Sequence, residues 1–367
     1  MSRPASAPSW ASFLGRENAG FGPIHIPAVA GRRILVTGAG GFIGAEIVRV
    51  LAASGATQIV LLEIAEHALF SIHEEMAANG CAERSIPVLG SVCDRSLLTA
   101  LFDQYRPGIV IHAAALKHVP LMERNPFAAV ATNSIGTWRI AQLAAEHRAR
   151  MILISTDKAV IPHSIMGASK RIAELAMLAH PGFTALRLVN VIGSPGSVAP
   201  IFAAQIAQGG PLTVTHPGAL RFFMTLEEVV GLLARTIASG SADGVLVPAP
   251  CERLLIVDLA RRMMAASGSD APIVFTGLRP GDKIDEQLIA AQERIDGTVA
   301  DGLRRVLTPP AADLDARVAG LESAIGSRDL PQLLRCVQDL VPDYQPSRLL
   351  REPAPQCAPA ASAFSLP

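Results

Sequence analysis

The sequence predicts an α/β fold in which a doubly wound parallel sheet is followed by a smaller C-terminal lobe. Between Arg33 and Leu188, short apolar runs alternate with amphipathic stretches, as in successive β-α-β units. The apolar runs show no polar alternation, which is typical of strands buried on both faces of a sheet. After Asn190, breaks rich in glycine and proline divide the chain into shorter pieces, as expected for excursions off a sheet.

Each expected strand is a short apolar run that ends where a polar or glycine-rich stretch begins. Helical stretches are expected between the strands, for example at Ile43–Ser54 and Arg95–Tyr105, and a further helical segment is expected at Asp313–Leu340. The expected strands are Ile34–Thr37, Ile59–Glu63, Ile86–Leu89, Ile109–His112, Ile152–Ser155 and Thr184–Val189.

The composition indicates a packed, cytoplasmic protein without a membrane span. Half of the residues are hydrophobic, and 32 basic residues balance 32 acidic ones, so bulk attraction to nucleic acid or to an anionic membrane is not expected. The five cysteines lack a C-x-x-C pair and indicate reduced thiols rather than disulfides or a metal site. No window reaches the roughly 20 apolar residues that a membrane helix needs. The N-terminus lacks the apolar core of a secretory signal.

A glycine-rich turn follows the first expected strand and opens a helix. The spacing of Gly38, Gly41 and Gly44 is typical of a Rossmann-type turn whose backbone N–H groups approach a pyrophosphate. Glu63 ends the second strand, where a carboxylate accepts bonds from the adenosine ribose and repels a 2′-phosphate. We therefore expect NAD rather than NADP, with Glu66 as the alternative ribose contact. A glycine-rich turn without a ligand is the structural alternative. The expected cofactor contacts are Gly38, Gly41, Phe42, Ile43, Gly44, Glu63, Ala113, Ala114 and Lys170.

The segment Ser155–Lys170 resembles the active-site segment of short-chain dehydrogenases, with methionine where a tyrosine is expected. In those enzymes a Tyr-x-x-x-Lys pair on one helix removes the proton from a substrate hydroxyl. Met166 has no ionisable proton and cannot do so. Thr156, Asp157 and Lys158 offer acid–base groups just past a buried strand, where enzymes of this architecture place their chemistry.

Further segments occur in the order found in one family. They resemble the polysaccharide-biosynthesis (CapD-like) family of nucleotide-sugar 4,6-dehydratases, which belong to the extended short-chain dehydrogenases. The chain resembles the soluble catalytic half of longer members that carry an N-terminal membrane region. The resemblance implies hydride transfer from sugar C4 to tightly bound NAD, loss of water across C5–C6 and return of the hydride to C6, best known on UDP-N-acetylglucosamine. The segments are Leu61–Glu66, His112–Pro120, Ser155–Val160, Met166–Lys170, Gly210–Pro217 and Gly277–Lys283.

The resemblance also implies catalytic roles. Asp157 would protonate the departing C6 hydroxyl, and Lys158 would take the C5 proton. Thr156 would relay the C4 hydroxyl proton, and Met166 would form an apolar wall and mark an enzyme that retains the C5 configuration. A cation at Lys170 can bond the nicotinamide ribose and lower the pKa of a nearby acid. The structural alternatives are an ion pair that caps the strand and a solvated helix lysine.

Several basic and polar residues are expected to bind the substrate. Lys117 follows a strand and is expected to face the sugar or the cofactor. Guanidinium forks match phosphate oxygens, although a surface salt bridge is the alternative for each arginine. Departures from the family pattern at Ser91, Ile161–Ser164 and Val247–Cys251 leave the sugar open. The expected contacts to the nucleotide diphosphate are Asn190, Arg221, Arg279 and Lys283.

These segments divide the chain into four parts. Residues 1–30 are expected to be a partly disordered N-terminal extension, and residues 31–190 an NAD-binding Rossmann domain. Residues 191–346 are expected to form mainly a substrate-binding lobe with a C-terminal helix, and residues 347–367 a disordered tail. The resemblance implies a homo-oligomer, a dimer or larger.

Three functions are compatible with these residues. The first is dehydration of UDP-N-acetylglucosamine with retention at C5. The second is dehydration or 4-epimerisation of another sugar nucleotide, for example a GDP-linked one; an epimerase has no use for the pair Asp157 and Lys158. The third is a non-catalytic regulator that binds NAD or a nucleotide sugar, against which the retained Lys170 argues.

Overall fold

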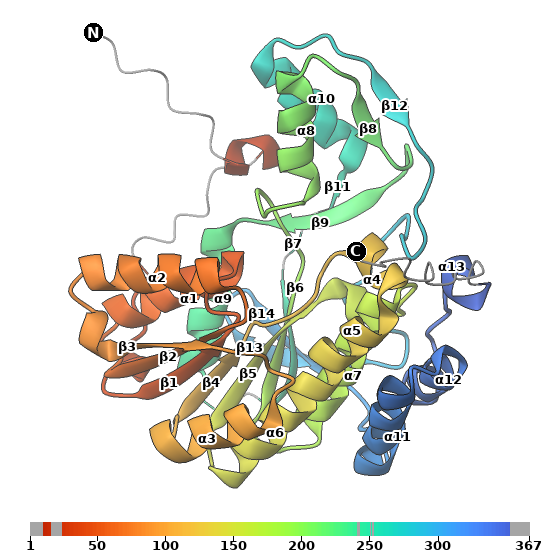
Figure 1. The fold of residues 1–367 in the computed structure, drawn as a ribbon. Helices are drawn as coiled ribbons and strands as arrows, with labels where there is room; N and C mark the ends of the chain where they lie inside the picture. The colour runs from red at the N-terminus through yellow and green to blue at the C-terminus, as the bar shows by residue number, and fades with distance from the viewer. Residues whose placement is uncertain (1–9, 16–23, 241–242, 250, 252, 353–367) are drawn as a thin grey trace, which may run out of the picture.

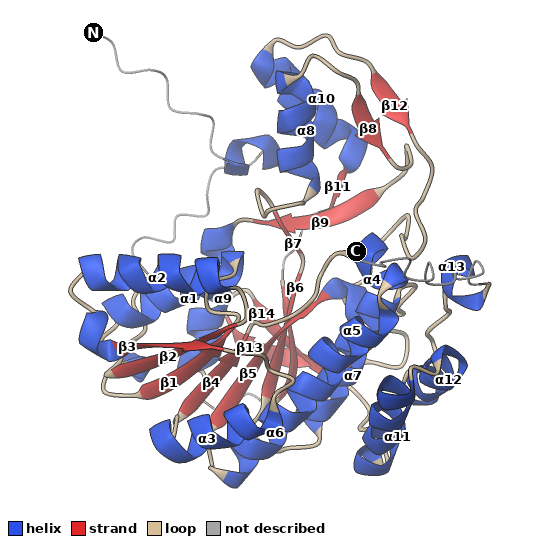
Figure 2. Cartoon of the chain, in the orientation of Figure 1, coloured by secondary structure: helices blue, strands red, loops and turns tan. Residues whose placement is uncertain are grey.

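A central sheet with helices on both faces forms the larger part of the molecule, and a smaller lobe stands at one end of it (Figure 1, Figure 2). The computed structural model describes residues 10–15, 24–240, 243–249, 251 and 253–352. Nine strands make up the central sheet, in the order β3-β2-β1-β4-β5-β6-β10-β14-β13. The strands are β1 (Arg33–Thr37), β2 (Gln58–Glu63), β3 (Ser85–Leu89), β4 (Ile109–His112), β5 (Arg150–Thr156), β6 (Thr184–Leu188), β10 (Gly244–Pro248), β13 (Arg294–Ala300) and β14 (Leu303–Leu307).

The predicted α/β fold and its six strands are confirmed. The strand ends differ from the expected ones by two residues or fewer. Strands β1 to β6 and β10 are parallel, with Ile34 opposite both Ile59 and Ile109 in the register. Val189 lies outside the sheet, because the chain leaves it there to form β7 (Asn190–Val191) in the lobe.

Helices cover both faces of the sheet, as the continuous apolar strands require. On one face, side chains of α1, α2 and α9 pack against Ile34, Val36 and their neighbours. On the other face, side chains of α3, α6 and α7 pack against Leu35, Val110 and their neighbours. These helices are α1 (Phe42–Ala53), α2 (Glu66–Ala78), α3 (Arg95–Tyr105), α6 (Gly136–Glu146), α7 (Ile165–Leu178) and α9 (Leu226–Ala238).

The lobe consists of short strands and two helices around an apolar core of its own (Figure 1). Strands β11, β9 and β7 form one small sheet, and β12 and β8 form another. Phe13, on a 3-10 helical turn at Trp10–Leu14, joins this core, and Arg262 of α10 donates a hydrogen bond to its carbonyl oxygen. The elements are α8 (Val198–Ala207), β8 (Leu212–Val214), β9 (Leu220–Met224), β11 (Arg253–Leu255), α10 (Ile256–Ser267) and β12 (Ile273–Phe275).

The chain after residue 190 differs from the expected single lobe. Helix α9 and strand β10 return to the body, where β10 pairs in parallel with β6. Strands β14 and β13 then extend the sheet antiparallel. The return is possible because β10 is a buried apolar run that completes the sheet beyond β6. The chain therefore passes from the body to the lobe and back twice.

The expected helical segment Asp313–Leu340 is two helices, α11 (Leu314–Ser327) and α12 (Leu330–Leu340). They break at Arg328, whose φ of +58° ends α11, and Asp329 caps α12 by accepting a hydrogen bond from the N–H of Gln332. Both helices pack on a core shared with α7, α4 (Val119–Arg124) and α5 (Pro126–Val130).

Both termini are more ordered than expected where they are described. The prediction of a disordered tail from residue 347 is wrong for its first part, since α13 (Arg348–Arg351) contacts α4 and buries Leu350. The rest of the tail, residues 353–367, lies outside the described residues, as do residues 1–9 and 16–23 of the N-terminal extension.

A buried ion network ties β6, α7 and the segment before β13 together. Arg187 on β6 is fully buried and lies 2.8 Å from both Glu174 of α7 and Glu293. Arg171 pairs with the same two carboxylates, at 2.9 and 2.7 Å. Despite burial, which raises it, the pKa of Glu293 is lowered to about 2 by Arg187 and Arg171. A network this well paired stabilises the fold only while every member is present.

We predict that Arg187→Met lowers the free energy of unfolding by about 3–5 kcal/mol, because two buried carboxylates lose their main partner. Urea unfolding followed by circular dichroism measures the change. The control is Arg261→Met, which removes an exposed pair with Asp258 and should change the same quantity by less than about 0.5 kcal/mol. Equal stability of the two variants would contradict the prediction.

Candidate active site

The glycine turn between β1 and α1 has no room for side chains. Gly38 has a φ of +67°, and a Cβ there would lie 2.7 Å from the backbone N of Ala114. A Cβ on Gly44 would overlap the carbonyl oxygen of Gly38. Gly41 is the N-cap of α1, so the first turn of that helix opens at the glycine turn. This close packing fits a turn whose N–H groups bind an anion.

Glu63 at the end of β2 faces the glycine turn. Its carboxylate accepts hydrogen bonds from the backbone N–H groups of Gly40, Ile64 and Ala65, at 3.1, 2.9 and 3.0 Å. A carboxylate has about four acceptor positions, so a ribose hydroxyl can still donate to it. The alternative, Glu66, is an exposed residue in the first turn of α2.

Lys170 of α7 is buried below the end of β5. Its side chain is 4% exposed, and its Nζ donates a 2.7 Å hydrogen bond to the carbonyl oxygen of Ile154. Burial lowers its pKa to about 8, and Glu174 partly opposes this shift. With this pKa, part of the Lys170 side chains lose their proton near physiological pH, whereas an exposed lysine stays almost fully protonated.

His112 was missed by the sequence reasoning. It is fully buried at the end of β4, and its ring nitrogens lie 2.6 Å from the hydroxyl of Thr37 and 2.9 Å from that of Thr137. Burial, with a contribution from Lys170, lowers its pKa to about 3, so the ring is neutral at physiological pH. His112 therefore links β1, β4 and α6 below the glycine turn. Buried hydroxyl partners give no local sequence signal.

Thr156, Asp157 and Lys158 form one hydrogen-bonded cluster at the end of β5. The Nζ of Lys158 lies 2.9 Å from Oδ1 of Asp157, which also accepts a 2.9 Å bond from the hydroxyl of Thr156. Asp157 is fully buried, and its Oδ2 makes no hydrogen bond to the described residues. Burial alone lowers the pKa of Lys158, but Asp157 and Glu286 more than offset it, so this pKa lies above the usual value.

The first turn of α7 lies against this cluster. Ser164 caps the helix by accepting a 3.1 Å hydrogen bond from the N–H of Gly167. A Cβ on Gly167 would overlap the carbonyl oxygen of Lys158, so glycine is needed for the approach. Met166 is 3% exposed and joins the core shared with α4, α5, α11 and α12. The side chain of Met166, which stands where short-chain dehydrogenases have their tyrosine, is therefore largely enclosed by protein.

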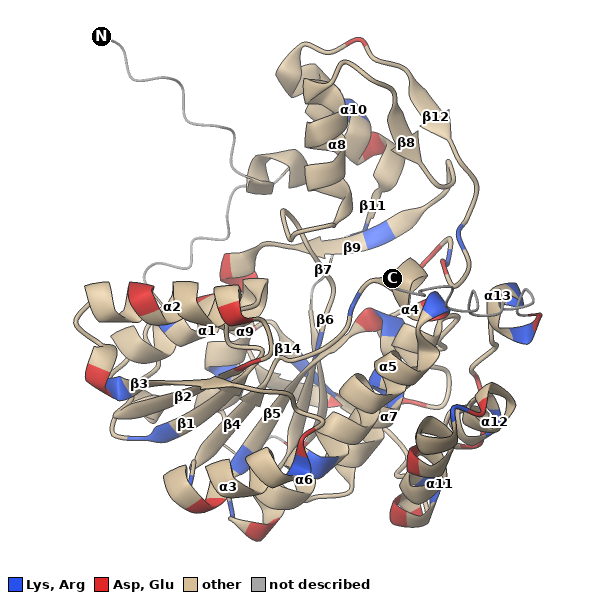
Figure 3. Cartoon of the chain, viewed as in Figure 1, with Lys and Arg blue, Asp and Glu red and all other residues tan. Residues whose placement is uncertain are grey.

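Three of the expected substrate contacts lie together where β7 and β9 of the lobe meet the end of β5, the region that we call the base of the lobe. Asn190 accepts a 3.0 Å hydrogen bond from Lys158 and donates one to Phe222 on β9. Arg221 on β9 donates to the carbonyl oxygens of Leu220, Lys283 and Ile284. Figure 3 shows a basic segment on β9, with further charged segments on the stretch that descends from β12. Lys283 belongs to that stretch and donates a 2.7 Å bond to the carbonyl oxygen of Val160.

Two expected contacts lie apart from this group. Arg279 is exposed and pairs with Asp282 at 2.9 Å. Lys117 is also exposed and donates a 3.0 Å hydrogen bond to the carbonyl oxygen of Pro195. A buried carboxylate that was not predicted, Glu286, lies instead among the cations at the base of the lobe.

The sequence contains only four lysines, and all four were predicted as site residues. Every other basic residue is an arginine. Lys158 and Lys283 each lie within 4 Å of a different carboxylate oxygen of Glu286, and Lys170 is bonded to Ile154 near the end of β5. Lysine, unlike arginine, loses its proton readily when it is buried.

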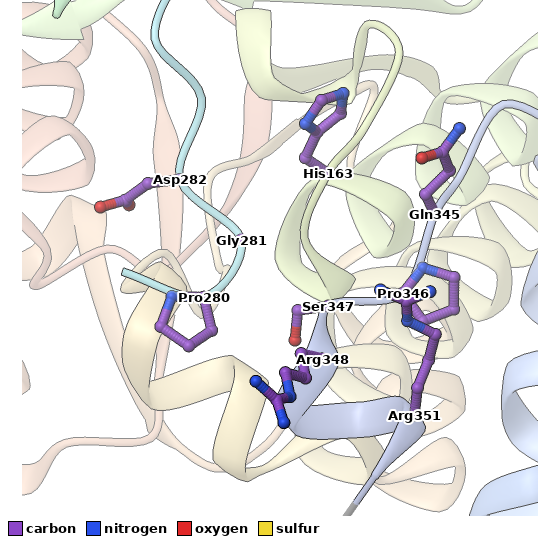
Figure 4. Close-up of a pocket in the computed structure, with 9 residues that line it drawn as sticks. All are labelled: His163, Pro280, Gly281, Asp282, Gln345, Pro346, Ser347, Arg348 and Arg351. Carbon is purple, nitrogen blue, oxygen red and sulfur yellow. The ribbon is translucent and has the colours of Figure 1, made fainter. Parts of the chain in front are cut away.

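A separate cavity of about 230 Å³ lies behind the segment Pro280–Asp282 (Figure 4). Arg348, Arg351 and Ser347 line it on one side and His163 on the other, and the side chain of Asp282 points away from the two arginines (Figure 4). None of the predicted site residues lines this cavity.

Two further findings bear on function. No group of three or more His, Cys, Asp or Glu side chains among the described residues is placed to hold a metal ion. None of the described helices has the length and apolar character needed to cross a membrane.

Comparison with known proteins identifies a family. Residues 34–307 match the family model described as "Polysaccharide biosynthesis protein". The chain is 41% identical over 273 residues to the capsular polysaccharide biosynthesis protein CapD of Staphylococcus aureus, covering 71% of this chain and 46% of CapD. It is 43% identical over 277 residues to the probable polysaccharide biosynthesis protein EpsC of Bacillus subtilis, covering 72% and 46%. The chain thus spans about half the length of these relatives.

The fold resembles solved structures of sugar-nucleotide enzymes. One is DesIV of Streptomyces venezuelae, a dTDP-glucose 4,6-dehydratase solved as a double mutant with NAD and DAU bound. The TM-score is 0.62 at 23% identity, covering 69% of this chain and 86% of DesIV. At this identity the likeness shows the fold alone.

We predict that Gly44→Ala lowers the free energy of unfolding by about 1–3 kcal/mol, because its Cβ forces the start of α1 away from Gly38. Urea unfolding measures this. Gly326→Ala is the control: Gly326 lies in α11 with no atom within 4 Å of the added Cβ. That variant should be unchanged or up to about 1 kcal/mol more stable. A Gly44→Ala protein as stable as the control would show that the turn tolerates a side chain.

We predict that Lys170 titrates near pH 8 rather than 10.5. The ε-carbon signal of 13C-labelled lysine measures this directly, and Lys170→Met assigns the signal. Between about pH 8 and 10.5 the unfolded chain holds a proton that folded Lys170 has released, so stability rises with pH in this window. The Lys170→Met protein should lose that part of the slope. A midpoint near 10.5 for the Lys170 signal would refute the prediction.

Proposed function

Because the chain belongs to the polysaccharide biosynthesis protein family, we propose that it is an NAD-dependent nucleotide-sugar 4,6-dehydratase. The proposed substrate is UDP-N-acetylglucosamine, and the proposed product is the UDP-4-keto-6-deoxy-N-acetylhexosamine with the C5 configuration retained. The product would serve surface polysaccharide or glycan biosynthesis. We further propose that the enzyme works as a homo-oligomer.

The observation that carries the proposal is the contact between Asp157 and Lys158 at the end of β5. Oxidation at C4 alone, as in a 4-epimerase, needs no further acid–base pair. Elimination of water needs both a base for the C5 proton and an acid for the C6 hydroxyl. Asp157 and Lys158 supply both within one hydrogen bond of 2.9 Å.

The glycine turn and Glu63 fit the cofactor. The N–H groups of residues 38–41 are bonded within the protein, so the first-turn N–H groups of α1, at Phe42 and Ile43, would bind the pyrophosphate, and Glu63 retains an acceptor position for a ribose hydroxyl. When bound, NAD would accept the hydride from sugar C4 and return it to C6. Lys170 would hold the nicotinamide ribose, and its charge would favour the ionised form of a neighbouring acid.

A proton shift within the ion pair would prepare it for elimination. In the free site Lys158 carries the proton and Asp157 is its partner. Moving that proton from Nζ to the carboxylate gives a neutral amine and a neutral acid, a form favoured where water is excluded. The amine then takes the C5 proton, the C5–H electrons form the C5=C6 bond, and the C6 hydroxyl leaves as water with the proton of Asp157. The ion pair is thereby restored.

Other residues would orient the substrate. Thr156 donates to Asp157 and can relay the proton of the C4 hydroxyl, whereas Met166 would supply only an apolar contact. Arg221 is fixed by three backbone carbonyl groups, so its position for a diphosphate is preset. Lys117 and Arg279, which are more exposed, would contact outer parts of the sugar nucleotide.

Two alternatives remain as outcomes of one assay. The protein is incubated with NAD and UDP-N-acetylglucosamine in deuterated water, and the product is followed by mass spectrometry and NMR. A 4-keto product that has lost one water and carries deuterium at C5 supports dehydration. A sugar of unchanged mass and inverted C4 identifies an epimerase, and parallel reactions with other sugar nucleotides, for example a GDP-linked one, test the second alternative. Bound NAD without turnover of any sugar nucleotide identifies a regulator.

We predict that Lys158→Ala abolishes water loss and leaves NAD binding unchanged, because the side-chain partners of Lys158, namely Asp157, Asn190 and Glu286, do not belong to the glycine turn. Turnover in the same assay and NAD binding by calorimetry measure the two effects. Arg261→Met, on the outer surface of α10, should keep both properties. Full activity of Lys158→Ala would remove Lys158 from the mechanism.

A further inference from the structure

Glu286 lies among cations that come from three different parts of the chain. Its Oε1 is 3.9 Å from Nζ of Lys158, which follows β5, and 3.9 Å from Nε of Arg221 on β9. Its Oε2 is 3.3 Å from Nζ of Lys283. His163 is close enough for the charge of Glu286 to act on its pKa. One carboxylate thus faces the proposed catalytic lysine and two proposed phosphate-binding residues.

Glu286 is buried but not fully paired. It is 4% exposed, and its Oε2 makes no hydrogen bond to the described residues in spite of the nearby Lys283. The same holds for Oδ2 of Asp157, on the other side of Lys158. Buried carboxylates are usually hydrogen-bonded. Here the carboxylate is held by ion pairs at 3.3 to 3.9 Å, so another anion can replace it as the partner of the cations.

The backbone fixes the place of Glu286. Arg221 donates to the carbonyl oxygens of Lys283 and Ile284, and the N–H of Leu220 donates to Ile284 as well. Residue 285 forms an isolated bridge with Leu220. These bonds lock the stretch after Lys283 onto β9. Glu286 therefore follows a stretch of backbone that is hydrogen-bonded to the base of the lobe.

Three cations in a partly buried site repel one another unless an anion lies among them. A diphosphate would provide that anion when the substrate is bound. Before that, the described residues offer Asp157, which pairs with Lys158, and Glu286, which alone reaches Arg221 and Lys283.

We propose that Glu286 is an internal counter-ion, a positioning residue that gathers Lys158, Arg221 and Lys283 in the free site and yields Arg221 and Lys283 to the substrate's diphosphate. The inference rests on the proposed function in taking these two residues as the diphosphate site. Two consequences follow. Glu286 competes with the diphosphate and weakens its binding. It also helps Asp157 to raise the pKa of Lys158 and so to keep that lysine charged, whereas Arg221 lowers the same pKa.

The experiment compares Glu286→Gln with the wild type by two measurements that need no turnover. Calorimetry with UDP as the probe measures diphosphate affinity. The ε-carbon signals of 13C-labelled lysine measure the titration of each of the four lysines. The matched control is Asp285→Asn, which removes the adjacent, half-exposed carboxylate that pairs with Arg253.

In Glu286→Gln we expect UDP to bind roughly 3- to 10-fold more tightly, since one competing charge is removed. The Lys158 titration should move to lower pH, while that of Lys117 stays in place. Asp285→Asn should change neither. A purely structural role for Glu286 would weaken UDP binding. Weaker or unchanged UDP binding, or an unmoved Lys158 titration, overturns the proposal.

Glu286→Asp decides the matter if Glu286→Gln does not fold. The shorter side chain keeps the charge but draws it away from the three cations, so UDP affinity and the Lys158 titration should both shift part of the way. Values equal to those of the wild type overturn the proposal.

Both measurements are independent of the reaction. If UDP affinity and the Lys158 titration shift as expected while no water is lost from UDP-N-acetylglucosamine, the proposed function fails and the counter-ion role of Glu286 stands. If water is lost but neither UDP affinity nor the Lys158 titration shifts, the proposed function stands and the counter-ion role fails.

Discussion

One buried carboxylate, Glu174, holds the elements of the candidate active site in register. It accepts hydrogen bonds from Arg171 on its own helix, from Arg187 on β6 and from Ser155, the residue before Thr156. Glu174 therefore joins the strand end that carries the acid–base cluster to the helix that carries Lys170. Glu293 completes the network from a third segment: it lies 106 positions after Arg187 in the sequence but accepts a hydrogen bond from it directly. Because all members are buried and paired, small displacements of any one are costly.

The candidate site depends on the repeated passage of the chain between the body and the lobe. Lys158 comes from the sheet, Arg221 from the lobe, and Lys283 and Glu286 from the stretch that leads back to the body. The candidate site thus brings together residues that are far apart in the sequence. The bonds from Arg221 to the 283–284 backbone are what bind the lobe strand to the returning stretch.

The features that could be predicted from the sequence are those with a local cause. Apolar runs without polar alternation predict buried parallel strands, and the glycine spacing reflects contacts within one strand–turn–helix unit. The place of Glu286 among the cations could not be predicted, because only Lys283 is near it in sequence and its other partners come from β9 and from the end of β5. The break at Arg328 was equally hidden, since the left-handed turn there uses no glycine. The antiparallel addition of β14 and β13 depends on pairing with β10, which sequence periodicity does not report.

The rarity of lysine in this chain has a consequence for covalent chemistry. Arginine does not lose its proton in proteins, so the lysine side chains are the basic groups of this chain that can become neutral amines. An electrophile selective for lysine would find no side-chain target on the outer helices, and the lowered pKa of Lys170 would make that amine nucleophilic near pH 8. For most proteins such a reagent labels the whole surface. For this one it would have four side-chain targets, of which Lys117 is exposed and Lys158, Lys170 and Lys283 lie at the candidate site.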